Sequence, residues 1–225
     1  MPNHVTNKIE IHGDNVEEIK DFVKSDYSDF DFNKFIKMPE SLNIESSGRT
    51  DYAFLYALTK EFTKEVSYTI REHANKAFRS MFGSVEYNIE EAKKLVQSLD
   101  DKSLAEFKEL GEKALSNYNL YGVLTWYEWC PKNWGTKWNA YEVTVEDNTI
   151  TFDTAWNDPE PIIKLLLEKF KFTGRIKSYD EGGWFWYNRL YKDGVLIEDR
   201  YKLEEDQESL SRELKGWWYK DEDEE

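Results

Sequence analysis

The chain has a single cysteine, Cys130, among its 225 residues. One thiol excludes an internal disulfide and any cysteine-cluster metal site, and it fits a reducing cytosol. No apolar run approaches the roughly 20 residues that a membrane helix needs. The first residues lack the basic and then apolar segments of a signal peptide. From these absences we expect a cytoplasmic protein with no membrane partner.

Cations are scarce relative to acids, with 30 Lys and Arg against 45 Asp and Glu and a net charge of −15. Direct binding to nucleic-acid phosphates needs clustered cations, so no direct nucleic-acid binding is expected. Residues 198–225 hold 12 acidic against 5 basic residues, which is nearly half of the excess. Such acidity keeps a protein soluble, suits a basic partner surface, or imitates the charge of a nucleic acid.

Residues suited to catalysis or metal binding do not gather in the sequence. The three histidines, His4, His12 and His73, are scattered and lack metal-ligand spacing. Cys130 has no histidine nearby that could activate it as a nucleophile. Gly182-Gly183 lies between two predicted strands and not before a helix, so it is no phosphate cradle. The sequence therefore predicts no catalytic residue, no metal and no cofactor.

The chain is nevertheless rich enough in apolar residues, at 40%, to build a core. Alternation over residues 4–12 predicts a strand, and Asn7 on its apolar face would need hydrogen-bond partners. Asp14 with Glu17 fits a capping box for a helix that runs to about residue 24. The phenylalanines of residues 30–36 favour a short extended segment.

Residues 51–118 are helical in character and show no strand pattern. Apolar stripes recur at helical spacing, and Thr50 or Asp51, Asn88 and Ser103 are typical N-caps for them. A stripe of apolar residues also covers 66–78. This region reads as a helical subdomain inserted into another fold.

From Tyr141 the pattern alternates with a period of two. Asp147-Asn148 and Asp193-Gly194 are typical of tight hairpin turns. Asp158 is the expected cap of a helix with Pro159 in its first turn. In order, we expect strands at 141–145 and 150–152, a helix at 159–170, a strand at 172–179, a hairpin of 184–191 with 195–201, and a last helix at 209–219.

The element order predicts an α+β fold, a ferredoxin-like antiparallel sheet (split βαβ) with an inserted helical subdomain and an added C-terminal hairpin. One helix from each half should cover one face of the sheet. The predicted domains are 1–50 as the first half, 51–118 as the insertion, 119–203 as the second half with the extra hairpin, and 204–225 as an acidic C-terminal helix and tail.

Three pieces of the sequence carry a family resemblance. They are the Met-Pro-Asn start with Asn7, the run Phe30-Asp31-Phe32-Asn33-Lys34 before Met38-Pro39-Glu40, and the tryptophan-rich segments between Trp126 and Trp156. Together they resemble the YubB-type ferredoxin-like domain family, found mostly on phages, plasmids and other mobile elements. Lys37 departs from the proline expected before Met38. The resemblance implies a fold and a bacterial host cell, and it implies no activity or catalytic residue.

Five of the nine tryptophans lie between Tyr118 and Trp156 and suggest a binding site. Aromatic faces beside amides and a carboxylate can hold a base, a sugar or a peptide. Tryptophans that cap the core and hydrogen-bond to a nearby Asn or Asp would give the same sequence. The aromatic run that begins at Trp184 either packs under the insertion or faces a partner. The candidate binding residues are Trp134, Lys137, Trp138, Asn139, Asp153, Trp156, Trp184 and Trp186.

The leading functional hypothesis is a non-enzymatic binding protein of a phage or mobile element. It would contact a host protein and inhibit or redirect it, for example a defence or replication factor. One alternative is an acidic nucleic-acid mimic that sequesters a DNA-binding protein. Another is an enzyme or small-ligand binder that uses a pocket of Trp134, Trp138 and Trp156.

Overall fold

The computed structural model of this protein describes residues 3–59 and 89–217. The chain divides into two compact units, one of Met1–Lys37 with Cys130–Glu225 and the other of Met38–Trp129. We call the first the sheet unit and the second the helical unit. The apolar stripe expected at 66–78, the cap expected at Asn88 and the acidic tail at 221–225 lie outside the described residues.

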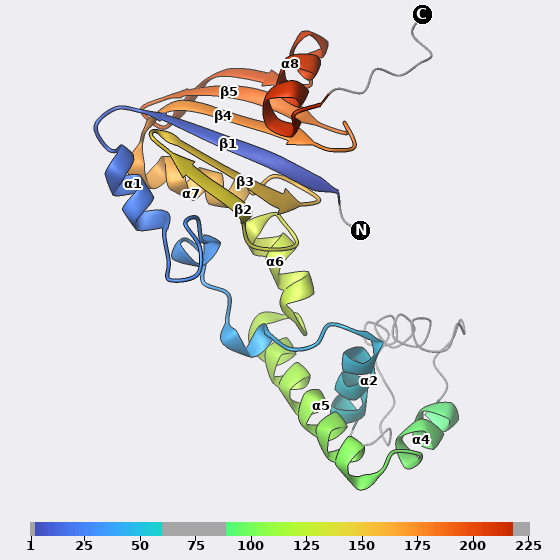
Figure 1. The fold of residues 1–225 in the computed structure, drawn as a ribbon. Helices are drawn as coiled ribbons and strands as arrows, with labels where there is room; N and C mark the ends of the chain where they lie inside the picture. Colours follow the sequence, from blue (N-terminus) through green and yellow to red (C-terminus); the bar gives the residue numbers. More distant parts are fainter. Residues whose placement is uncertain (1–2, 60–88, 218–225) are drawn as a thin grey trace, which may run out of the picture. The chain divides into compact units, whose positions relative to one another are not determined.

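The sheet unit is built on one antiparallel sheet with the strand order β2-β3-β1-β4-β5-β6 (Figure 1). Both predicted hairpin turns are confirmed. Asp147 joins β2 to β3 with a φ of 37°, and Asp193-Gly194 joins β5 to β6 with φ values of 52° and 77°. The strands are β1 (His4–His12), β2 (Tyr141–Glu146), β3 (Thr149–Ala155), β4 (Thr173–Asp180), β5 (Trp186–Lys192) and β6 (Val195–Tyr201).

Two helices, α1 (Val16–Val23) and α7 (Glu160–Phe170), cover one face of this sheet (Figure 1). The order β1-α1-β2-β3-α7-β4 is the predicted split βαβ arrangement, and β5 and β6 extend the sheet beyond β4. Apolar side chains of both layers meet between them and bury their surface from water. The fully or almost fully buried ones include Val5, Ile9, Ile11, Ile19, Val23, Ile150, Phe152, Ile162, Leu166 and Ile176.

Asn7 is the polar exception on the apolar side of β1, and only 1% of it is exposed. Its amide donates to the carbonyl of Val5 at 3.1 Å and to the hydroxyl of Thr154 at 2.9 Å. Its oxygen accepts a 2.9 Å hydrogen bond from Ser178. The expectation that Asn7 finds partners is confirmed, and the bonds tie β1 to both neighbouring strands.

The segment after α1 closes the edge of this core. Phe30 and Phe32 are fully buried, with ring centroids 4.6 and 6.1 Å from that of Phe152. The predicted extended conformation is wrong here, because η1 (Phe32–Lys34) is a short 3₁₀ turn. Its cap, Asp31, accepts a hydrogen bond from the backbone N–H of Asn33. That side-chain bond offers the backbone a turn where the phenylalanines suggested a strand.

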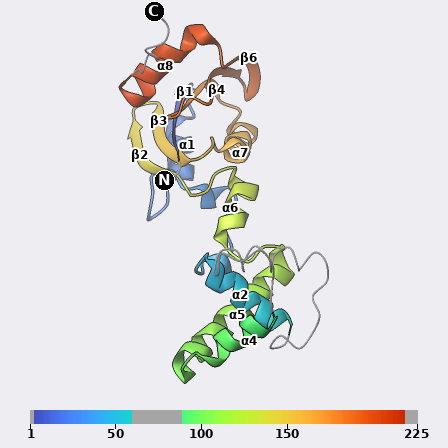
Figure 2. The ribbon, with the colours of Figure 1, turned by 90° about the vertical axis from the view of Figure 1, so that its right-hand side faces the viewer.

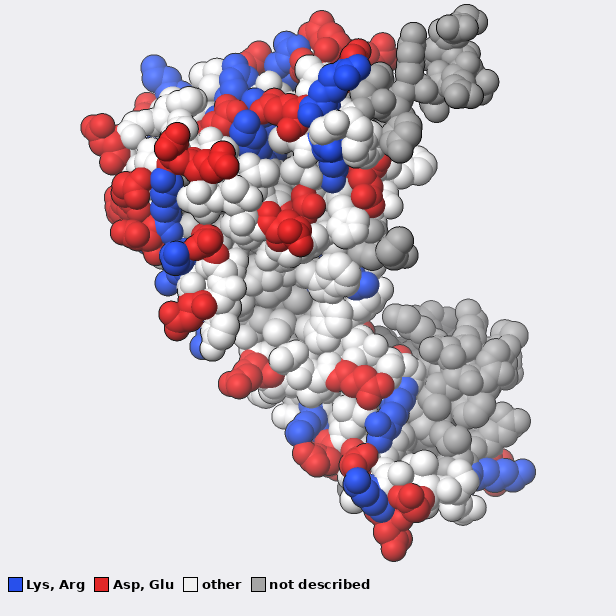
Figure 3. All heavy atoms as spheres, in the orientation of Figure 1, with Lys and Arg blue, Asp and Glu red and all other residues white. Residues whose placement is uncertain are grey.

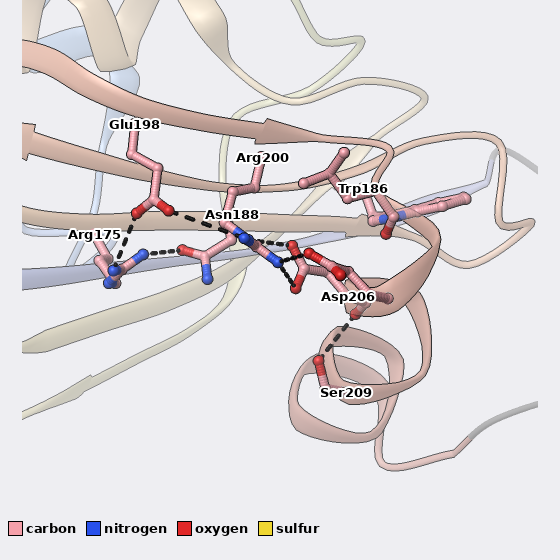
Figure 4. A network of polar contacts seen from close by, with 9 residues as sticks. Arg175, Trp186, Asn188, Glu198, Arg200, Asp206 and Ser209 are labelled. Carbon is pink, nitrogen blue, oxygen red and sulfur yellow. Dashed lines mark hydrogen bonds and ion pairs between the residues drawn. The ribbon is translucent and has the colours of Figure 1, made fainter.

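The opposite face of the sheet carries α8 (Glu204–Lys215), as Figures 1 and 2 show. This helix begins five residues before the predicted Ser209 and ends at Gly216, whose φ of 75° suits a left-handed C-cap. Figure 4 shows how its start is held: Arg200 of β6 makes two 2.7 Å hydrogen bonds to Asp206. Trp186 donates to the carbonyl of Leu203 at 3.0 Å. The C-terminal helix, and not only α1 and α7, therefore covers the sheet.

The helical unit contains η2 (Glu40–Leu42), α2 (Gly48–Leu58), α4 (Ile89–Gln97) and α5 (Asp101–Tyr121). Its core includes Tyr52, Phe54 and Leu55 of α2 and Phe107 of α5. The segment expected to be helical at 51–118 lies within this unit. The further helix α6 (Trp126–Trp134) contains the junction of the two units and was not predicted. In the segments that the structure describes, no helix is both long and apolar enough to cross a membrane.

The predicted helix caps are near the observed ones but wrong in identity. Asn15, Ser47 and Asp100 occupy the N-cap positions expected for Asp14, Thr50 or Asp51, and Ser103. Pro159 precedes α7 in the place expected for Asp158. Several residues with capping side chains lie next to one another at each start, and local sequence alone does not choose among them.

Candidate functional site

Trp134, a member of the predicted tryptophan pocket, belongs to the core. Only 3% of it is exposed, and its ring lies edge-on to Phe32 at 5.8 Å. Its indole N–H donates a 2.8 Å hydrogen bond to the carbonyl of Ile36. This burial agrees with the structural interpretation of the motif, but the hydrogen-bond partner is a backbone carbonyl and not the Asn or Asp side chain that was expected. The ring therefore holds the turn at 32–36 against the sheet.

Asn139 also has a structural role, because its side chain is hydrogen-bonded within the sheet unit. Its side-chain oxygen accepts 2.9 Å hydrogen bonds from the backbone N–H groups of Phe32 and Ala140. Its amide donates to Asp31 at 2.7 Å. Burial raises the pKa of Asp31, but the hydrogen bonds from Asn139 and Asn33 outweigh burial and leave that pKa below its usual value. Asn139 thus fixes the loop before β2 to the capped turn.

Three of the predicted residues do come together at the surface. The Lys137 ammonium lies 4.8 Å from the ring centroid of Trp138 and 4.7 Å from that of Trp156. Trp156 is 36% exposed and has a φ of 75°, an uncommon conformation for a tryptophan. Cation–π contacts of this kind are favourable and hold the two rings close to one charge. We call these three residues the tryptophan–lysine cluster.

Asp153 is connected to this cluster by Tyr141, which neighbours both. Tyr141 pairs with Asp153 across β2 and β3, and its ring lies edge-on to Trp138 at 6.1 Å. Burial, then the charges of Asp153, Glu181 and Glu142, raise the pKa of Tyr141 to about 12. Asp153 itself accepts a 2.6 Å hydrogen bond from Thr6. The Tyr141 hydroxyl also lies 2.6 Å from Nδ1 of His4.

The two remaining candidates separate from each other. Trp184 is 74% exposed, in the loop between β4 and β5. Trp186 is 6% exposed and stacks on Tyr179 beneath α8, next to Leu210. Its ring is covered by α8, a helix that neither alternative in the sequence analysis named. Of this pair, only Trp184 offers its ring to solvent.

Cys130 is buried, and burial raises the pKa of its thiol to about 12. A thiol with that pKa is protonated at neutral pH, so it lacks the thiolate that nucleophilic attack requires. Among the described residues, no three His, Cys, Asp or Glu side chains are grouped so as to hold a metal ion.

The structure adds a site that the sequence did not predict. A groove of about 310 Å³ lies between α7 and the added β5–β6 hairpin. Ile163 and Leu167 of α7 form one wall, and Tyr187, Arg189 and Leu196 of the hairpin form the other. The groove exists because the hairpin extends the sheet beyond the area that α7 covers. Pockets that combine apolar walls with a few polar groups are the usual places for binding.

Tyr187 and Asp158 are hydrogen-bonded polar residues of the groove lining. The Tyr187 hydroxyl, on a side chain that is 2% exposed, donates a 2.9 Å hydrogen bond to Asp158. Burial raises the pKa of Asp158, although this hydrogen bond and the nearby Arg189 act in the opposite direction. Burial and the Asp158 charge also raise the pKa of Tyr187 well above its usual value. Perturbed groups in a groove mark a candidate site, although structural pairs also shift pKa values.

Arg189 brings a cation to the same place. Its guanidinium carbon lies 4.1 Å from the ring centroid of Tyr187, and its Nε donates a 3.0 Å hydrogen bond to Asp199 of β6. Stacking and pairing together hold the guanidinium against the groove wall. The groove therefore combines apolar walls, a half-buried carboxyl group and a fixed, paired cation.

Sequence reasoning missed these residues because they come from separate parts of the chain. Asp158 and Tyr187 are 29 residues apart. Asp158 was expected to cap a helix, and not to bond to a residue of a distant strand. One signal was available: alternation along 186–191 places Tyr187, Arg189 and Tyr191 on one face of the predicted strand. A face of two tyrosines around an arginine is unusual for a purely apolar core.

Comparison with known proteins bears on the fold. Residues 133–223 match the protein family described as "Ferredoxin-like domain in Api92-like protein". The match covers less than half of the chain and includes β2 to β6, α7 and α8. With the strand order above, it establishes the α+β, ferredoxin-like fold expected from the sequence.

One solved structure is similar, the crystal structure of a protein api92 from Yersinia pseudotuberculosis. The similarity covers 88% of this chain and 97% of that chain, at 12% sequence identity and a TM-score of 0.42. Among curated proteins, none matches this chain.

Proposed function

We propose that this protein is a non-enzymatic binding protein of a phage or other mobile element, which acts in the bacterial cytoplasm by contact with a host protein. The resemblance to the YubB-type family motivates the setting. The observation that carries the proposal is the groove beside α7, which continues into exposed apolar residues of β6. Exposed apolar surface next to a groove is typical of a protein-binding face. Inhibition of a defence or replication factor would follow from occupying that partner.

The polar groups of the groove suit binding better than catalysis. Asp158 is bonded to Tyr187, and Arg189 is paired with Asp199, so each charged group already has a partner within the protein. Paired groups fix the shape of a groove and favour recognition of a complementary surface.

A second candidate is a small-ligand site at the tryptophan–lysine cluster. The observation that favours it is the exposed Trp156 ring beside Lys137 and Trp138. A flat ligand such as a base or a sugar could stack there, with Asp153 and Tyr141 as polar neighbours. This site is separate from the groove residues, so variants of each can be tested independently.

A third candidate, sequestration of a DNA-binding protein by charge mimicry, is motivated by the net charge of −15. Figure 3 shows acidic and basic side chains interspersed over the sheet unit. Ion pairs such as those of Arg200 with Asp206 and of Lys177 with Glu213 neutralise some of the acidic side chains within the protein. An interspersed surface resembles a phosphate backbone less than a row of unpaired carboxylates would.

Affinity purification of the tagged protein from bacterial lysate, at low and at moderate salt, separates these functions. The proposal expects one protein in stoichiometric amount at both salts, because apolar contact resists salt. Several basic proteins that are lost at moderate salt would instead indicate charge mimicry. Retention of no protein at either salt would contradict the proposal and favour the small-ligand site.

A further inference from the structure

The two edges of the sheet differ in how they are protected. At one edge, β2 has a register irregularity between Tyr141 and Thr144, and Glu142 there has a φ of 49°. Glu142, Thr144 and Glu146 are its exposed residues. A bulge and outward acids are the usual devices that keep another strand from pairing with an edge.

The other edge, β6, also has a register irregularity, between Leu190 and Tyr191 of its partner β5, but the first half of β6 carries apolar side chains in place of outward acids. Val195, Leu196 and Ile197 are consecutive and are 63%, 44% and 57% exposed. No proline interrupts the strand, and β6 is the last strand in the sheet order. Three exposed apolar residues on a terminal strand are a template for pairing with a further strand.

The charged second half of β6 is neutralised within the protein. Glu198 accepts a hydrogen bond from Arg175, Asp199 from Arg189, and Arg200 binds Asp206 and Glu205 (Figure 4). Paired charges repel an approaching strand less than free ones do, because the net local charge is small. The charges of this second half therefore do little to oppose an added strand.

The groove runs along the same edge. Leu196 belongs both to the exposed part of β6 and to the groove lining, with Leu167 and Ile163 opposite. Side chains of a strand alternate between faces, so every second residue of an added strand would point toward α7 and the groove. The backbone would pair with β6 while these side chains pack in the groove.

Charge decides what kind of segment fits. The groove lining has three carboxyl groups, Asp158, Glu160 and Glu168, against Lys164 and Arg189. Lys164 lies 3.9 Å from Glu168, and Arg189 is paired with Asp199 outside the lining. Glu160 is exposed beside them at the start of α7. A second copy of this chain would bring another net charge of −15 to the edge, whereas a basic segment would be attracted.

We infer that β6 and the groove bind an extended segment of a partner protein, in which apolar residues alternate with Lys or Arg, and that this segment adds a seventh strand to the sheet. The inference rests on the proposed binding function and specifies the chemistry of the partner. Backbone pairing supplies affinity, and the apolar and basic side chains supply specificity.

Synthetic peptides of about eight residues, the length of a strand, provide the test with the full-length protein. The probes are a labelled alternating Val/Lys peptide, a Ser/Lys peptide of equal charge, and a Val/Lys peptide with alternate backbone nitrogens methylated. Binding is followed by fluorescence anisotropy. We expect the first probe to bind at least about tenfold more tightly than the other two, which lack apolar side chains or strand pairing.

Two matched variants locate the binding. Leu196→Lys places a charge at the β6 edge and should weaken binding of the Val/Lys peptide by about tenfold or more. Leu120→Lys makes the same change on α5, where Leu120 is 67% exposed, and should leave binding as in the wild type. Circular dichroism verifies that both variants remain folded.

Equal binding of the Val/Lys and Ser/Lys peptides would overturn the inference in favour of charge alone. Binding that Leu196→Lys leaves unchanged would overturn it in favour of another surface. Dimerisation of the wild type that Leu196→Lys abolishes, measured by sedimentation, would make a second copy the occupant. A host protein captured equally by wild type and Leu196→Lys would leave the binding function standing and remove the edge-strand site, whereas capture of neither protein nor peptide would remove both.

Discussion

The Tyr187 hydroxyl donates a 2.9 Å hydrogen bond to Asp158, and so joins β5 to a residue two positions before the start of α7. Tyr187 is buried and Asp158 is half-buried, and both line the groove. The hairpin that carries Tyr187 lies outside the six elements of the split βαβ arrangement. This bond therefore adds a side-chain link near α7 to the backbone pairing of β5 with β4, which joins the added hairpin to the ferredoxin-like part of the sheet unit.

Replacing Tyr187 with Phe tests how much this bond contributes to the free energy of unfolding. The ring would remain in place, while half-buried Asp158 would lose a hydrogen-bond donor. We expect the free energy of unfolding to fall by about 1–2 kcal/mol, the usual cost of leaving a buried polar group with one partner fewer. Urea denaturation at pH 7 measures it. Tyr27→Phe, at a residue that is 95% exposed, is the control and should change stability by less than about 0.5 kcal/mol.

The difference in stability between Asp158→Asn and wild type should depend on pH. Because burial raises the folded-state pKa of Asp158, the fold favours its neutral form. The contribution of this group to stability is complete below the unfolded-state pKa, and it is lost as pH rises through the folded-state pKa. Asn stays neutral throughout. The stability of the variant relative to wild type should therefore increase between about pH 3.5 and pH 7.

Urea denaturation of both proteins across that pH range measures the difference. Asp14→Asn, at an exposed residue before α1, controls for the loss of one carboxylate from the chain. A stability difference between Asp158→Asn and wild type that stays constant with pH would show that Asp158 is ionised equally easily in the folded and unfolded states.

The parts of the fold that the sequence predicted are those with local causes. Asp147-Asn148 and Asp193-Gly194 turn the chain because short polar residues and glycine tolerate positive φ. The strands between them follow from alternation. The helix caps were displaced by one to four residues, since neighbouring side chains can each accept the same kind of bond.

The candidate site was less predictable because it depends on which faces meet. Trp134 and Trp138 are four residues apart, yet one lies in the core and the other lies beside Lys137 near the surface. Trp186 and Tyr187 point to opposite faces of the sheet, one under α8 and the other toward Asp158. Composition marks these residues as important, but only the packing of α7 and α8 assigns them to a core or a groove.

The bonds of Asn139 lead to a second prediction with a pH dependence. Asn139→Ala removes two acceptor bonds and the donor to Asp31, which is 7% exposed. We expect a loss of about 2–3 kcal/mol at pH 7, from several buried groups left unsatisfied. The lowered pKa of Asp31 means that its carboxylate stabilises the fold above the unfolded-state pKa, and that this stability is lost as pH falls through the folded-state pKa.

The cost of Asn139→Ala should consequently shrink as the pH falls through the folded-state pKa of Asp31, which lies below its usual value. Urea denaturation at pH 7 and at a series of acid pH values, continued until the cost no longer changes, compares the two conditions. Asn119→Ala, at an exposed residue of α5, is the control and should be nearly neutral at both. A cost of Asn139→Ala that is the same at neutral and at acid pH would show that its bond to Asp31 does not depend on the Asp31 charge.

Substitutions of Trp134 and Trp138 distinguish a role in the core from a role in binding a small ligand. Trp134→Ala removes a ring that is 3% exposed and breaks its bond to Ile36, so we expect a loss of about 3–5 kcal/mol. Trp138→Ala removes a cation–π contact and partial burial at the surface, so about 1–2 kcal/mol is expected. Thermal unfolding followed by circular dichroism measures both.

If the tryptophan–lysine cluster binds a ligand, Trp138→Ala and Asp153→Ala should lose binding while they remain folded, because neither side chain lies in the main core. Trp134→Ala would lose binding only together with its fold. Leu196→Lys, at the β6 edge, should leave ligand binding by the cluster unchanged. Unfolding of Trp138→Ala to the same extent as Trp134→Ala would assign both rings to the core, and the contact face would then be the groove and β6.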